Sequence, residues 1–188
     1  MALNVLLLGP QGAGKGTQAK RISAEYGIPH IASGEILRAE MDAGTDLGER
    51  VKETIERGDL VSDDLMIELI RNRLEQPDTE AGFVLDGFPR TIVQAETLDS
   101  MFADIGRNFS VAFALQIPDE VAFDRLRRRA RADDTDEAIQ RRLDNYHRET
   151  EPLIEFYRTR GNVVPIHANR SENEVFAEIS RALEQVPA

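Results

Sequence analysis

The sequence contains no cysteine and no tryptophan. The absence of cysteine excludes disulfide bonds and thiolate-ligated metal sites, so we expect no structural zinc. No apolar run approaches the roughly 18 residues that a membrane-spanning helix needs. The chain opens on an apolar run of strand length, with no basic stretch followed by a long apolar region, which argues against a secretory signal. These absences together predict a cytoplasmic protein without a membrane partner.

Lysine is also scarce, because only Lys15, Lys20 and Lys52 occur beside a large number of arginines. The 34 acidic residues exceed the 23 basic ones, and the formal net charge is −11. This sign opposes nonspecific binding to nucleic acid or anionic lipid. An acidic, lysine-poor surface suits a salt-rich cytoplasm, but a GC-rich genome that favours arginine codons explains it equally well. Neither explanation indicates a function.

Short apolar runs alternate with helix-like stretches along the chain. Expected strands lie at 3–9, 30–32, 82–87, 109–117 and 162–168, and the longer runs suit strands buried on both faces. Expected helices lie at 15–26, 34–42, 47–57, 63–75, 91–104, 119–131, 136–160 and 172–185, with N-caps among Ser62, Asp63, Asp64, Asp119 and Ser171. The alternation predicts one α/β domain over residues 1–188, with a parallel sheet covered by helices on both faces.

Two regions fit this alternation poorly. Residues 32–61 hold helix-like pieces with no strand between them, and residues 125–137 read RLRRRARADDTDE, which is too charged to be buried. We expect both to be excursions from the core, and such excursions often carry function.

A glycine-rich loop follows the first expected strand. The pattern G-x-x-x-x-G-K runs from Gly9 to Lys15 and is followed by an expected helix, which is the context of a phosphate-binding loop. Backbone N–H groups of such a loop surround the phosphates of a nucleotide, and Lys15 would reach the β- and γ-phosphates. Gly16 stands where most such loops have Ser or Thr, and Thr17 comes one place later. Direct Mg²⁺ coordination by Thr17 is therefore less secure.

Asp86 ends the buried run FVLD and precedes GFPR. A carboxylate at the end of such a strand faces the phosphate loop, where it can hold Mg²⁺ through water. The alternative interpretation is that Asp86 caps the following helix.

Six motifs in this order resemble those of adenylate kinases: GPQGAGKGT, SGEILR, GDLV, DGFPRT, RRRARADD and RRLDNYHRETEPL. The resemblance extends from residue 3 to about residue 180 and is closest to the short-lid bacterial form. It implies a P-loop three-layer sandwich with a five-stranded sheet, a helical insert at 32–61 for the nucleoside monophosphate and a short lid at 128–138. It also implies the reversible reaction of ATP with AMP to two ADP, with Mg²⁺, in a monomer.

The resemblance also implies roles for individual residues. For ATP they are Gly12, Ala13, Gly14, Lys15, Gly16, Thr17, Arg125, Arg129 and Arg170. For AMP they are Ser33, Arg38, Asp59, Leu60, Val61, Gly87, Phe88, Pro89, Arg90, Gln94, Arg131 and Arg142, with Gln94 on the adenine edge. The implied catalytic residues are Lys15, Arg90, Arg125, Arg131 and Arg142, while Asp133 and Asp134 match acidic residues that help to hold the closed lid.

The residue chemistry supports this reaction. Phosphoryl transfer between two nucleotides gathers many negative charges, so cations are needed at both donor and acceptor, and guanidinium groups bind phosphate bidentately. The attacking phosphate oxygen is already ionised near neutral pH, so we expect no catalytic role for His30, His147 or His167. Arg127 and Arg128 are instead expected on a solvated helix face.

Two other functions remain possible at this point. A UMP/CMP kinase shares the fold, loop and arginines, but Ser33, Thr91 and Gln94 favour adenine as the acceptor base. A regulatory nucleotide-binding ATPase would need only one nucleotide site, and the motif arginines Arg38 and Arg90 argue against it.

Overall fold

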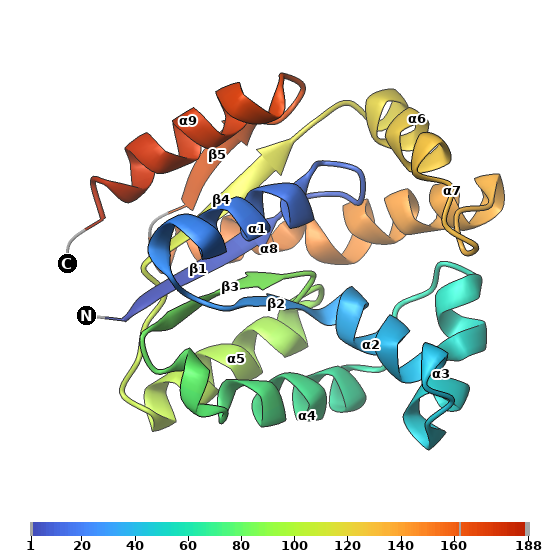
Figure 1. Ribbon diagram of the computed structural model, residues 1–188, viewed down its shortest axis with the longest axis horizontal. Coiled ribbons are helices and arrows are strands. Elements are labelled where there is room, and N and C mark those ends of the chain that lie inside the picture. Colours follow the sequence, from blue (N-terminus) through green and yellow to red (C-terminus); the bar gives the residue numbers. More distant parts are fainter. Residues whose placement is uncertain (1, 162, 187–188) are drawn as a thin grey trace.

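The computed structural model describes residues 2–161 and 163–186 and forms a parallel sheet between two layers of helices (Figure 1). The sheet has five strands in the order β2-β3-β1-β4-β5, so the first strand lies at its centre. The predicted three-layer α/β class is therefore confirmed. The strands are β1 (Leu3–Leu8), β2 (His30–Ala32), β3 (Gly82–Asp86), β4 (Val111–Gln116) and β5 (Val163–His167). The expected start of the last strand, Asn162, lies outside the described residues.

The helices fall close to the expected ranges except in one place. Residues 136–160 form two α-helices separated by a π-helical segment, Tyr146–Thr150, in which the Glu151 N–H donates to the Tyr146 carbonyl at 2.8 Å. Pro152 follows this segment; it lacks an N–H and its ring would crowd an α-helical carbonyl. The helices are α1 (Lys15–Tyr26), α2 (Ser33–Asp42), α3 (Asp46–Glu56), α4 (Asp63–Leu74), α5 (Ile92–Asp104), α6 (Asp119–Arg129), α7 (Asp136–Asn145), α8 (Pro152–Arg158) and α9 (Glu172–Leu183).

Side-chain caps begin four of these helices. Ser171 and Glu174 form a reciprocal capping box at α9, as expected for Ser171. Ser62 occupies the cap position of α4 without a side-chain hydrogen bond, and Asp63 and Asp64 are already helical. The expected cap at Asp119 is also wrong, because Pro118 takes that position.

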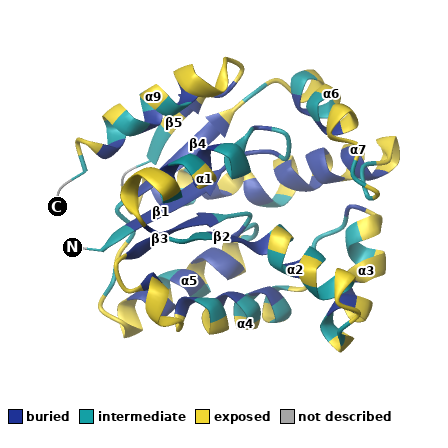
Figure 2. Ribbon diagram, in the orientation of Figure 1, coloured by how far each residue is buried: buried dark blue, intermediate teal, exposed yellow. Residues whose placement is uncertain are grey.

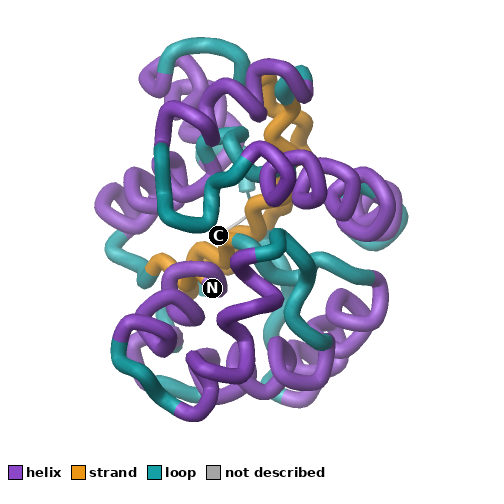
Figure 3. The backbone as a smooth tube through the Cα atoms, turned by 90° about the vertical axis from the view of Figure 1, so that its right-hand side faces the viewer, coloured by secondary structure: helices purple, strands orange, loops and turns teal. Residues whose placement is uncertain are grey.

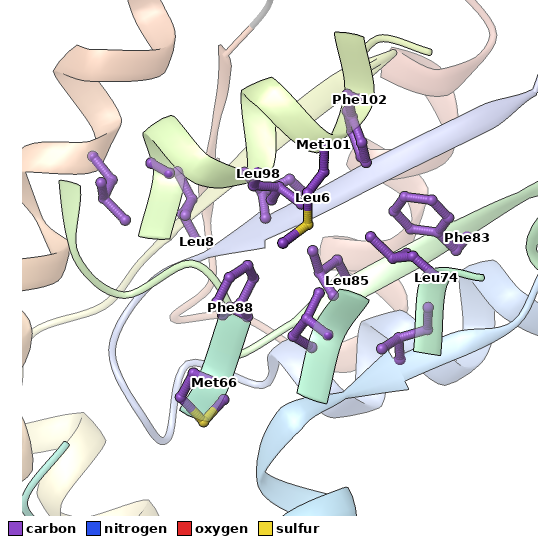
Figure 4. Packing of buried hydrophobic residues seen from close by; sticks show 14 of the residues in the cluster. Leu6, Leu8, Met66, Leu74, Phe83, Leu85, Phe88, Leu98, Met101 and Phe102 are labelled. Atoms are coloured by element: carbon purple, nitrogen blue, oxygen red, sulfur yellow. The ribbon is translucent and has the colours of Figure 1, made fainter. Parts of the chain in front are cut away.

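The central strand, β1, contributes side chains to two separate hydrophobic cores, one on each face of the sheet. Leu6 and Leu8 lie with the side chains of α4, α5 and α8, as Figure 4 shows in part, whereas Val5 and Leu7 lie with α1 and α9. Successive side chains of a strand point to opposite faces, so a continuous apolar run is buried on both sides. Each such fully buried side chain contributes about 1.5–3 kcal/mol. Figure 2 shows the buried strands between partly exposed helices.

The last strand differs from the expectation of a buried strand. In β5 only Ile166 is buried, and Pro165 is exposed. The reason is topological, because β5 lies at one edge of the sheet. A proline, which has no N–H to donate, is tolerated at such an edge.

The two excursions are partly helical and partly buried. Residues 32–61 contain α2 and α3, whose Leu37 and Val51 reach the main core. Residues 125–137 contribute Leu126 to a small cluster between α6 and α7, so the expectation that this stretch is too charged to be buried is partly wrong. Within the described residues no helix combines the length and apolar character needed to cross a bilayer.

His147 connects the start of α6 to the π-helical segment. Its Nδ1 lies 2.8 Å from Glu151 Oε2 and its Nε2 lies 2.9 Å from Asp119 Oδ2. The hydrogen bond with Glu151, followed by the bond and charge of Asp119, raises the pKa of His147, although partial burial opposes the rise. The imidazolium form therefore holds two segments that are distant in sequence.

We expect His147→Gln to destabilise the protein more at about pH 6 than at about pH 9. A raised pKa means that the contribution is complete below the unfolded pKa of about 6.5 and is lost as the pH rises through the folded pKa. The side chain is 43% exposed, so the effect should stay below about 1 kcal/mol. Urea unfolding at both pH values measures it. An equal loss at both would contradict the prediction, and Glu151→Gln should show the same pH dependence.

Candidate active site

A cavity of about 640 Å³ lies at the carboxyl ends of the strands. Its lining comes from the segments that follow β1, β2, β3 and β5, together with residues of α6 and α7. Figure 3 views the molecule from this side, where helices and loops surround the sheet. In open parallel sheets this edge is where ligands bind.

The glycine loop forms one part of the cavity. Gly12 and Gly14 have φ angles of 85° and 89°, which favour glycine, and Gly14 stands immediately before α1. Lys15 Nζ donates to the carbonyls of Gly9 and Pro10 at 2.8 and 2.9 Å. Burial lowers the pKa of Lys15 to about 8, although the charge of Asp86 opposes this shift. At neutral pH the amine is therefore still mainly protonated, and an incoming phosphate would favour this ammonium form further.

Arginines from α6 and from the end of β5 border the same loop. Arg125 donates to the Gly12 carbonyl at 3.3 Å and to the Ala168 carbonyl at 3.2 Å, so it joins the loop to the segment after β5. Arg170 is paired with Glu178 and also donates to the His167 carbonyl at 2.9 Å. The Arg125 guanidinium therefore already contacts the backbone of the glycine loop.

Asp134 places its carboxylate between two arginines beside the cavity. Its side chain has 0% exposure and lies 2.7 Å from both Arg129 Nη2 and Arg142 Nη1. It also accepts from Arg129 Nε at 2.9 Å and from the Arg131 N–H at 3.2 Å. Burial alone would raise the pKa of Asp134, but the hydrogen bonds and charge of Arg129 outweigh it, and the pKa is lowered. The neighbouring Asp133 holds Arg142 Nη2 at 2.5 Å.

A second group of side chains lies after β2 and β3. Ser33 Oγ and Arg90 Nε both donate to the Gly87 carbonyl, at 2.8 and 2.7 Å. Burial lowers the pKa of Arg38, and the nearby charge of Arg131 lowers it further. Gln94 is 1% exposed; its amide nitrogen donates to Asp63 Oδ1 at 2.8 Å and its oxygen accepts from the Arg90 N–H at 2.7 Å.

Almost every residue that the resemblance implied lines this one cavity. There are three exceptions. Asp134 lies behind Arg129 and Arg142, Phe88 is 1% exposed in the hydrophobic core, and Pro89 lines a neighbouring space of about 30 Å³. Arg127 lies on the exposed side of α6 and pairs with Asp136 at 3.3 Å. Thr91 is outside the lining too, because its hydroxyl caps α5 and donates to Asp63.

Asp86 faces the glycine loop. A side-chain carbon added to Gly16 would lie 3.5 Å from Asp86 Oδ2, and His30 Nε2 lies at the same distance from that oxygen. Burial would raise the pKa of Asp86, but the nearby His30 imidazole and the charge of Lys15 leave it lowered. The capping alternative is wrong, since Thr91 caps α5.

Mg²⁺ fits this donor set only together with a nucleotide. Among the described residues no three His, Cys, Asp or Glu side chains form a metal-binding group. Mg²⁺ commonly uses one or two carboxylates and completes its shell with phosphate oxygens and water. Asp86 supplies such a carboxylate beside the loop.

Sequence reasoning missed several polar contacts across the cavity. Asn145 Nδ2 donates to the Gly58 carbonyl at 3.2 Å, and Arg142 Nη2 donates to the Ile55 carbonyl at 3.3 Å. These contacts attach α7 to the end of the 32–61 segment. His30 and Asp63 were also missed as partners of Asp86 and Gln94. No motif signalled these pairs, because each joins segments that are distant in sequence.

Comparison with known proteins matches the family model described as adenylate kinase to residues 7–162. The chain is 42% identical to an adenylate kinase of Phocaeicola vulgatus, over 98% of this chain and 100% of that protein. It is 39% identical to an adenylate kinase of Methanosarcina barkeri, over 97% of this chain and 99% of that protein. An adenylate kinase of Stenotrophomonas maltophilia is 40% identical, over 96% of this chain and 99% of that protein.

The family model spans most of the chain, and these relatives are aligned over nearly their whole length. The glycine loop, the arginines of the motifs and Asp86 lie around one cavity. The chain belongs to the adenylate kinase family of phosphotransferases.

Proposed function

We propose that the protein transfers a phosphoryl group reversibly from ATP to AMP, with Mg²⁺, to give two ADP. The main support for this proposal is that one continuous cavity contains both groups of side chains. It joins the glycine loop and Arg125 to a second group that contains Arg38, Arg90 and Gln94. A regulatory ATPase has no need of this second group.

The two groups suit two nucleotides placed end to end. The loop N–H groups, Lys15 and Arg125 would hold the phosphates of ATP, and Arg129 and Arg170 border that part of the cavity. Ser33, Arg38 and Arg90 would hold the phosphate of AMP, with Gln94 toward its base. The transferred group would then pass between Lys15, Arg131 and Arg142. Catalysis would rest on alignment and on cancelling charge.

Asp133 and Asp134 would set the arginines in advance. Arg129 and Arg142 are already ion-paired with these carboxylates, so their guanidinium planes are held before any phosphate arrives. Such preorganisation reduces the entropy that binding must remove. A phosphate oxygen would then extend an existing charge network.

Asp86 would hold Mg²⁺ through water, with Thr17 nearby, and the bound ion would offset charge on the β- and γ-phosphates. Residues 32–61 and 128–138 would act as the nucleotide-binding insert and the lid, whose closure excludes water. Both groups of the cavity belong to one chain, so the proposed reaction needs no residue from a second copy.

The identity of the phosphoryl acceptor can be tested directly. ADP formation from ATP and Mg²⁺ should require AMP when AMP, CMP, UMP and GMP are offered in turn. Arg90→Ala should lower kcat/KM by at least about a hundredfold, because it removes a buried cation from the acceptor phosphate. Coupled assays of ADP formation measure both effects.

Arg158→Ala is the control for Arg90→Ala, since Arg158 is 63% exposed and pairs with Glu155 on its own helix. It should retain wild-type activity. Turnover with CMP or UMP in place of AMP would contradict the choice of acceptor. ADP formation that is indifferent to every monophosphate would contradict the acceptor site itself.

The ion pairs of Asp134 should affect both stability and activity. Asp134→Asn should lower the free energy of unfolding by about 1.5–3 kcal/mol, because two guanidinium groups lose an ionised hydrogen-bond partner. It should also lower kcat/KM by at least about tenfold. Chemical denaturation and the ADP assay measure the two effects.

Asp136→Asn is the matched control, because Asp136 is 57% exposed and pairs with an exposed arginine. Its effect on stability should stay below about 1 kcal/mol. Equal losses of stability and activity in Asp134→Asn and Asp136→Asn would contradict the role of the Asp134 ion pairs.

A further inference from the structure

Gln94 is held between two groups of opposite hydrogen-bonding character. Its Nε2 donates to Asp63 Oδ1 at 2.8 Å, and its Oε1 accepts from the Arg90 N–H at 2.7 Å. The residue is 1% exposed, so water does not replace either partner freely. Both contacts are short enough to be strong hydrogen bonds.

The carbonyl and amino ends of a glutamine side chain have nearly the same shape and can exchange by rotation of the amide. Here an ionised carboxylate only accepts and a backbone N–H only donates. A rotated amide would place its oxygen against the carboxylate and its NH₂ against the N–H. Asp63 and the Arg90 backbone therefore select a single orientation of the amide.

Asp63 is itself held in place. It is the first residue of α4, and the Thr91 hydroxyl donates to the same Oδ1 at 2.9 Å. That hydroxyl also accepts the Gln94 N–H at 3.2 Å and so caps α5. Thr150, in the π-helical segment, donates to the Arg90 carbonyl at 2.8 Å. The network joins α4, α5 and the segment after β3 around one amide.

The orientation of this amide matters for the base that it meets. A 6-aminopurine presents an acceptor at N1 and a donor at its amino group, whereas a 6-oxopurine presents a donor at N1 and an acceptor at O6. An amide with a single orientation matches one of these patterns and opposes the other. Opposed hydrogen bonds discriminate strongly in a buried site.

We propose that Asp63 is a positioning residue for base selection: it holds the Gln94 amide in the orientation that accepts a 6-aminopurine monophosphate and rejects a 6-oxopurine one. This inference rests on the proposed function, in which Gln94 faces the acceptor base. Asp63 itself does not line the cavity and acts through Gln94.

The test compares AMP with inosine monophosphate as acceptors for the full-length protein. Asp63→Ala should raise the KM for AMP by about tenfold and change kcat little, because one charge-assisted hydrogen bond to the amide is lost. The ratio of kcat/KM for AMP over inosine monophosphate should fall by about tenfold. Asp63→Asn keeps an acceptor oxygen and should restore most of the ratio.

Asp64→Ala is the matched control, since Asp64 is exposed, carries the same charge and lies in the same first turn of α4. It should leave the ratio at the wild-type value. In a Gln94→Ala background, Asp63→Ala should have no further effect on the ratio, because Asp63 acts only through that amide.

The outcomes separate this proposal from the proposed function. Wild-type protein that uses no AMP contradicts both. Wild-type protein that uses AMP, with an unchanged base ratio in Asp63→Ala, contradicts the role of Asp63 alone. A fall of equal size in the Gln94→Ala background also contradicts it, because the effect would then bypass Gln94.

Discussion

Confinement of positive charge within a single cavity is the constraint on which much of this structure depends. Arginines from α2, α6 and α7 and from the segment after β3 line the same cavity as the glycine loop, although the protein as a whole carries a net charge of −11. Mutual repulsion among these cations must be offset before any nucleotide binds. Asp86, Asp133 and Asp134 supply the opposite charge, each within reach of a basic partner. Because the side chain of Asp134 has no solvent exposure, its attraction to Arg129 and Arg142 is weakly screened.

This charge network also links the two segments, 32–61 and 128–138, in which the sequence departs from the alternation of strands and helices. Arg142 binds Asp133 and Asp134 at the start of α7 and also reaches the Ile55 carbonyl. A single guanidinium thus contacts both the 128–138 segment and the 32–61 segment. Phosphate arriving between them would act on both segments through the same side chain. The coupling is local and electrostatic, and it needs no longer path through the sheet.

The fold class was predictable because strong local signals agree with one another. Continuous apolar runs, the glycine loop and the intervening helical patterns all indicate a parallel sheet. The departures occur where tertiary position decides. The prediction that β5 is buried was wrong, because its apolar residues do not indicate that the strand lies at the edge of the sheet. The single helix expected at 136–160 is interrupted by a π-helical segment, because Pro152 has no N–H to donate to an α-helical carbonyl.

At the candidate site, the amino-acid sequence indicates which chemical groups are available and which motifs contain them. The spacing of residues within a motif is fixed by the covalent chain, so Lys15, Arg90 and Gln94 could be named from sequence. Their neighbours follow from the packing of the folded chain: Asp134 lies between Arg129 and Arg142, His30 lies beside Asp86, and Asp63 accepts from the Gln94 amide. Each of these hydrogen bonds or ion pairs depends on a distance across space. Such distances are set by how helices pack on the sheet, and no local pattern of residues encodes them.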